Sequence, residues 1–129
     1  MDTDKKTQVL LALYIEYQKD LPRMRNVTAA ALEMDTDVFN ISLVKLETEG
    51  YITGLKAFAA DDKHFYGVDT SGVMLTRDGL DRAEQVLEIE KAQSSKEKLK
   101  RAAVKCGALG LRALKLFAAA ALEHIEDVF

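Results

Sequence analysis

The sequence predicts a mainly helical α+β fold in which a short β-hairpin lies between helices. Two segments carry this prediction: LETEGYITG at residues 46–54 and MLTRDGL at residues 74–80. Apolar residues recur at helical spacing up to Gly50, and a β-rich stretch opens at Tyr51. Thr76 then has the side chain that caps a new helix. This order of helix, strand, turn, strand and capped helix is the outline of a winged helix.

The first helix is expected over residues 3–19, ending before Pro22 because proline disfavours a helical residue in front of it. A brief alanine-rich helix is expected over residues 27–34. Asp35 or Thr36 then caps a third helix, which ends at Gly50 because glycine readily adopts the left-handed conformation of a helix end. The second and third helices would form a helix-turn-helix. The buried stripe of the first helix is predicted to contain Val9, Leu10, Leu13, Tyr14 and Tyr17.

Strands are expected over residues 51–59 and 65–68, with the polar turn 60–63 as the wing tip. Residues 73–75 either add a third strand or lead directly to Thr76, so the wing has two or three strands. A helix follows over residues 77–92. Ser94 and Glu97 form a capping-box pair that starts a further helix, and Gly107 and Gly110 predict either two C-terminal helices or one kinked helix.

This length suits one domain, or one small domain with an appendage. We predict a winged-helix domain at residues 1–92 and an amphipathic helical extension at residues 93–129. The apolar face of the extension must be covered, either by its own domain or by a second copy. We expect a homodimer in which the oligomer interface contains Leu99, Leu109, Leu114 and Phe117. A membrane partner is not expected, because Arg112 and Lys115 interrupt the apolar run and the alanines at 118–121 make the apolar face thin.

Charge is unevenly distributed along the chain. Residues 1–90 carry 10 Lys/Arg against 17 Asp/Glu, a balance of −7, whereas residues 91–129 carry 8 against 4, a balance of +4. A DNA-binding domain normally presents a basic face. The charge of the first ninety residues therefore disfavours the DNA binding that a winged helix suggests.

The segments LVKLETEGYITG and LTRDGLDRAEQVL, together with the lysine-rich tail SSKEKLKRAAVKCGALGLRALKLF, resemble the YjcQ-like family of phage and prophage proteins. The pairing of the first two segments is also similar to that of MarR-like and PadR-like regulators. The resemblance covers nearly the whole chain and implies a winged-helix fold with an unassigned function. It implies no catalytic residue.

Two functions remain open from the sequence. The first is a DNA-associated transcriptional regulator that binds double-stranded DNA through the third helix and the wing, with asparagine and lysine as candidates for base or phosphate contact. The second is a winged helix that serves as a protein–protein interaction module, which suits the acidic first ninety residues. The candidate nucleic-acid-binding residues are Arg23, Arg25, Asn40, Ser42, Lys45, Lys56 and Lys63.

An enzyme is not expected, because no nucleophile elbow, phosphate loop or Cys/His pair occurs. His64 and His124 share no metal-ligand spacing with Cys106, so neither a metal nor a cofactor is expected. The single cysteine and the polar N-terminus favour a cytoplasmic location.

Overall fold

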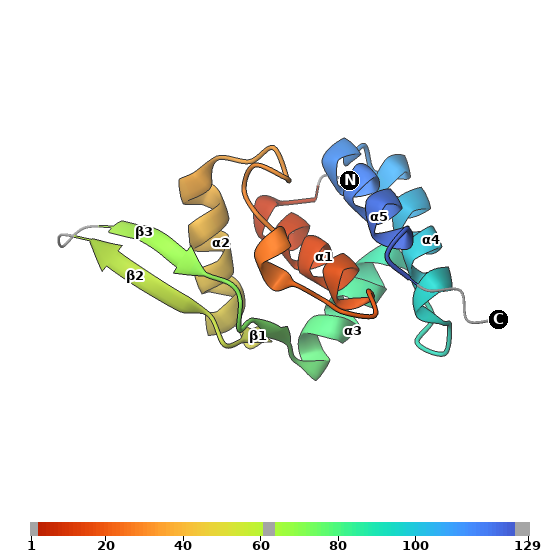
Figure 1. Ribbon diagram of the computed structural model, residues 1–129, viewed down its shortest axis with the longest axis horizontal. Helices are drawn as coiled ribbons and strands as arrows, with labels where there is room; N and C mark the ends of the chain where they lie inside the picture. The colour runs from red at the N-terminus through yellow and green to blue at the C-terminus, as the bar shows by residue number, and fades with distance from the viewer. Residues whose placement is uncertain (1–2, 61–63, 126–129) are drawn as a thin grey trace.

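The computed structural model describes residues 3–60 and 64–125 and shows a predominantly helical α+β fold, as predicted (Figure 1). The helices are α1 (Lys5–Tyr17), the short 3₁₀ helix η1 (Met24–Asn26), α2 (Thr36–Thr48), α3 (Arg77–Leu87), α4 (Ser95–Ala108) and α5 (Arg112–Leu122). The strands are β1 (Ile52–Thr53), β2 (Lys56–Ala60), β3 (His64–Asp69) and β4 (Met74–Leu75).

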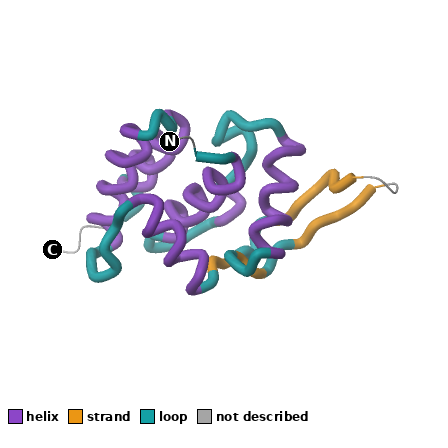
Figure 2. Tube along the Cα trace, turned by 180° about the vertical axis from the view of Figure 1, so that it is seen from behind, coloured by secondary structure: helices purple, strands orange, loops and turns teal. Residues whose placement is uncertain are grey.

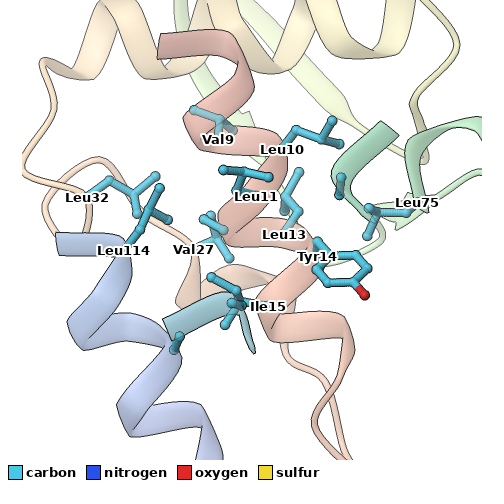
Figure 3. Close-up of a cluster of buried hydrophobic side chains, with 14 of the residues drawn as sticks. Val9, Leu10, Leu11, Leu13, Tyr14, Ile15, Val27, Leu32, Leu75 and Leu114 are labelled. Carbon is cyan, nitrogen blue, oxygen red and sulfur yellow. The ribbon is translucent and has the colours of Figure 1, made fainter. Parts of the chain in front are cut away.

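Helix α1 lies at the centre of the molecule, and α2, α3 and α5 all contact it (Figure 1). Every residue from Val9 to Glu16 is buried, so the predicted one-sided stripe was too narrow. A helix that is apolar all round belongs in the core, which is where α1 lies. Figure 3 shows its leucines among Val27 and Leu32 of the segment between η1 and α2, Leu75 of β4 and Leu114 of α5.

The helix starts predicted from polar side chains are confirmed. Asp35 accepts a hydrogen bond from the Val38 amide at 3.1 Å, and Ser94 accepts one from the Glu97 amide at 3.2 Å. Thr76 accepts from the Gly79 amide at 3.0 Å and also donates to the Gly50 carbonyl at 2.7 Å. The Thr76 hydroxyl thus joins the end of α2 to the start of α3, and Gly50 has the expected positive φ of 84°.

The predicted helix over residues 27–34 is wrong. Thr28 accepts a hydrogen bond from the Ala31 amide, but the segment makes only a turn, because Glu33 adopts a left-handed φ of 54° and the Met34 amide bonds back to Ala29. A single helical turn forms too few hydrogen bonds to offset the backbone entropy that is lost when it is ordered. Burial of Leu32 against the core fixes the segment instead. A helix-turn-helix with two regular helices is therefore not formed here.

The predicted strand over residues 51–59 is divided in two at Gly54. Strand β1 pairs antiparallel with β4, which confirms a third strand region at residues 74–75, while β2 pairs antiparallel with β3. Gly54 has a φ of 81°, and a Cβ atom there would lie 2.0 Å from the Gly72 carbonyl oxygen. The outer part of this hairpin projects from the helical body beside α2 (Figures 1 and 2). Residues 61–63 of the predicted turn, including Lys63, lie outside the described residues.

The C-terminal segment forms two separate helices that pack on each other, and α5 packs on α1. Leu99, Ala102 and Cys106 from α4 join the buried cluster of α1, as do Leu114, Ala118 and Ala121 from α5. The predicted extension therefore shares its core with the preceding residues.

Candidate nucleic-acid interface

Two of the residues predicted on the reading face of α2 are buried. Asn40 is 4% exposed and Ser42 is 3% exposed, and the Ser42 hydroxyl donates to the Val38 carbonyl at 2.7 Å. They lie on opposite flanks of the buried face that contains Phe39, Leu43 and Leu46. The sequence prediction treated these polar side chains as exposed, whereas packing on both flanks of α2 covers them. Neither can read a DNA base in this structure.

The outward face of α2 carries a mixed stripe at helical spacing. Val38 and Ile41 are 37% and 36% exposed, and Lys45 and Thr48 continue the same face toward the end of the helix. Lys45 is the cation of this face, and no ion pair to it occurs within residues 3–60 and 64–125. Of the three predicted α2 contacts, the structure therefore leaves Lys45 as the accessible one.

The glutamates near the end of α2 are occupied by contacts within the chain. Glu47 accepts a hydrogen bond from the Leu55 amide at 3.1 Å, where the hairpin departs from β1. Both carboxylate oxygens of Glu49 accept from the Lys6 ammonium at 2.8 Å, and this hydrogen bonding raises the pKa of Lys6. The charge of Glu49 is thus offset by Lys6, whereas Glu47 keeps its charge because its partner is a neutral amide.

The predicted basic residues outside α2 are divided between two places. Arg25 and Lys56 are both exposed and lie close enough to Asp69 to lower the pKa of its carboxyl, although hydrogen bonds from the Ser71 amide and hydroxyl contribute more. Arg25 and Lys56 therefore flank the base of the hairpin. Arg23 instead lines a separate concavity at the end of α1, together with Lys19, Asn26 and His124.

Of the residues predicted at an oligomer interface, Leu99 and Leu114 are 0% and 2% exposed because the chain's own core covers them. Leu109 and Phe117 are half-buried, and Phe117 packs against the same core. The sequence pattern of the C-terminal segment identified an apolar face correctly but could not show what covers it. Exposed apolar residues on these helices are Val104 and Leu116, at 67% and 53%.

A polar cluster that the sequence prediction missed joins α1, α3 and α4. The buried Tyr14 hydroxyl donates to Glu84 at 2.7 Å, and the same carboxylate accepts from Lys98 at 2.8 Å and from Lys91 at 3.0 Å. Burial opposes the charge on Glu84, but these hydrogen bonds outweigh burial and lower its pKa. Burial and the same bond raise the pKa of Tyr14. These residues are too far apart in sequence for a spacing pattern to reveal the cluster. Their hydrogen bonds connect α1, α3 and α4.

The described ranges contain no group of three or more His, Cys, Asp or Glu side chains placed to hold a metal ion. Burial raises the pKa of Cys106 to about 11, which disfavours the reactive thiolate. No helix within the described part of the chain is long and apolar enough to cross a membrane. The chain matches no protein-family model, no curated protein and no solved structure.

Proposed function

We propose that this protein is a winged-helix, DNA-associated regulator of the phage type that its sequence resembles. In this proposal α2 is the reading helix and the β2–β3 hairpin is the wing. The order of α2, hairpin and α3 supports it, as does the projection of the hairpin beside α2 (Figure 1). Double-stranded DNA is the partner, and no cofactor takes part.

The observation that carries the proposal is the state of the charges on α2. Lys45 faces outward, while Glu47 and Glu49 are held by the Leu55 amide and by Lys6. A phosphate near Lys45 would therefore meet less repulsion from Glu49 than the sequence suggests. Lys56 at the hairpin base would add a second backbone contact of the kind that positions a protein without reading bases.

Salt dependence of binding tests the proposal. The affinity for a mixed-sequence DNA duplex should fall steeply between about 50 mM and about 200 mM salt. Each of Lys45→Ala and Lys56→Ala should weaken binding and reduce the slope of log K against log salt by about 1. Lys100→Ala on α4, at the far end of the molecule from α2, is the matched control and should leave the slope unchanged (Figure 1). Absence of binding to any duplex at low salt would refute DNA association.

A protein-interaction module is the second candidate, and the apolar half of the α2 face favours it. Val38 and Ile41 lie beside Lys45, and apolar residues suit a protein partner better than a phosphate backbone. On this alternative, Ile41→Asp should abolish partner binding while Lys45→Ala has little effect. If instead Lys45→Ala weakens binding in a titration with a DNA duplex and Ile41→Asp has little effect, the DNA proposal is favoured.

A further inference from the structure

The two C-terminal helices have an exposed face on the side away from α1. Leu114 and Ala118 of α5 are buried in the core, whereas Leu116, two residues from each, is 53% exposed on the opposite side of the helix. Val104 is 67% exposed in the same way on α4. Val104 and Leu116 each lie five residues from the connection at residues 109–111, so they stand at the same level of the packed helix pair. No described residue covers this apolar part of the face.

The outward side of α5 has the spacing of a two-helix contact. Its exposed residues, at intervals of four, three and four, are Arg112, Leu116, Ala119 and Glu123. These intervals are those of the a and d positions in a coiled-coil seam. This set, the α5 stripe, is therefore apolar at its centre, with a cation at one end and an anion at the other.

Both charges of the α5 stripe lie at the unfavourable end of their own helix. Arg112 is the first residue of α5, where the helix dipole favours an anion, and Glu123 follows the last residue, where the dipole favours a cation. Leu111 offers no side-chain cap to α5, whereas α1, α2, α3 and α4 each begin with one. Neither Arg112 nor Glu123 forms an ion pair with a described residue. The described part of the chain therefore offsets neither charge.

We propose that a second copy of this chain binds the α5 stripe, with the two α5 helices antiparallel about a two-fold axis. Arg112 of each copy then lies opposite Glu123 of the other, and Leu116 lies opposite Ala119. One register gives both pairings, because the intervals 112–116 and 119–123 are equal. A large apolar side chain thus meets a small one, and each charge lies at the favourable end of the partner helix.

This contact is compatible with the rest of the surface. Lys115, which flanks the α5 stripe, lies opposite Ala120 of the second copy and meets no like charge. Helix α2 and the β2–β3 hairpin lie at the other end of the molecule, so the contact leaves the face with Lys45 exposed (Figure 1). The contact shares no residue with the interface predicted from the sequence, in which Leu99 and Leu114 are covered by their own chain.

Sedimentation equilibrium of the intact chain over a range of concentrations tests this contact. Since α5 has 11 residues and is about 16 Å long, the contact is small, and a dimer with a micromolar Kd is expected. Arg112→Glu and Glu123→Arg should each raise this Kd by roughly 10- to 30-fold, because the two-fold axis doubles the pair and a reversal makes both copies of it repulsive. The variant with both reversals should recover a Kd close to that of wild type. Arg77→Glu, at the exposed first residue of α3, is the matched control and should leave the Kd unchanged.

Thermal melts at low protein concentration distinguish a lost contact from a lost fold. Each single reversal introduces a charge that suits the α5 dipole, so the Tm of the monomer should not fall. Leu116→Asp should raise the Kd by about 10-fold or more, because a charge replaces the apolar centre of the contact, whereas Ile41→Asp on α2 should not.

A wild-type chain that stays monomeric at every concentration overturns the proposal. Single reversals without effect, or a double reversal that fails to restore association, overturn it as well. Dissociation by Ile41→Asp but not by Leu116→Asp would place the contact on α2 and would also contradict it. The measurement contains no DNA, so its outcome is separate from that of the proposed DNA binding.

Discussion

Replacement of Glu84 by alanine should destabilise this protein more than any exposed Glu→Ala change. Glu84 is 6% exposed, and its carboxylate accepts hydrogen bonds from Tyr14 on α1, from Lys98 on α4 and from Lys91 beyond α3. The Tyr14 side chain is fully buried, and the Lys98 side chain is only 15% exposed. Loss of Glu84 would leave both groups without their partner.

The expected cost comes mainly from these two orphaned groups. Removing one partner of a buried ion pair costs about 3–5 kcal/mol. Lys98 keeps some access to water, which favours the lower end, but the unsatisfied Tyr14 hydroxyl adds about 1–3 kcal/mol. Lys91 contributes little because its side chain is 61% exposed. A loss of about 4 kcal/mol is a large share of a typical stability of about 5–15 kcal/mol and corresponds to a fall in Tm of about 10–20 °C.

Urea unfolding followed by circular dichroism measures this loss, with Glu88→Ala as the matched control. Glu88 also pairs with a lysine of α4, Lys105, but its side chain is 61% exposed, so its removal should change the unfolding midpoint little. A double-mutant cycle between Tyr14→Phe and Glu84→Ala should give a coupling of about 1.5–3 kcal/mol, as for a hydrogen bond to a charged group. Equal midpoints for Glu84→Ala and Glu88→Ala, or additive effects in the cycle, would refute this reasoning.

Three further predictions concern acid, the C-terminal helices and the hairpin. The pKa of Glu84 is lowered in the folded state, so its contribution to the free energy of unfolding should be complete above the unfolded pKa of about 4.3. This contribution should be lost as pH falls through the folded pKa. The difference in stability between wild type and Glu84→Gln should therefore become smaller in acid. Leu114→Ala should lower the free energy of unfolding by about 2–5 kcal/mol, measured by calorimetry, whereas Leu116→Ala, at an exposed position, should lower it little. A changed sedimentation coefficient of Leu114→Ala without a lower Tm would show instead that a second copy covers Leu114. Gly54→Ala should unfold the hairpin base, because the new Cβ atom would meet the Gly72 carbonyl. Gly50→Ala should cost only the strain of a positive φ, about 1–2 kcal/mol. Equal melting temperatures for the two variants would contradict the steric argument.

The local features of the fold could be predicted because each depends on a few adjacent residues. Asp35, Thr76 and Ser94 begin their helices with hydrogen bonds that span three residues, and Gly50 ends α2 through its own conformation. The glycines left two C-terminal helices or one kinked helix open; the structure has two, with Gly110 at the break and Gly107 inside α4. Each of these features depends on residues within one helical turn, so the local amino-acid sequence is enough to predict it.

The candidate site was predicted less completely, because exposure depends on what packs against each face. Lys45 and Lys56 are accessible, but Asn40 and Ser42 are covered. No sequence pattern distinguishes a polar residue on an exposed helix face from one on a covered flank. The same limit applies to Leu99 and Leu114, whose apolar character was evident and whose partner was not.

The sequence alone therefore determined the helix caps, the glycine breaks, the hairpin between α2 and α3 and the amphipathic C-terminal segment. Tertiary structure decided the rest: the failure of the helix at residues 27–34, the burial of α1 on every side and the contacts that occupy Glu47, Glu49 and Glu84. The reason is physical. Caps and turns are set by hydrogen bonds between near neighbours, whereas burial and ion pairing join residues such as Tyr14 and Glu84, which only the folded chain brings within 2.7 Å.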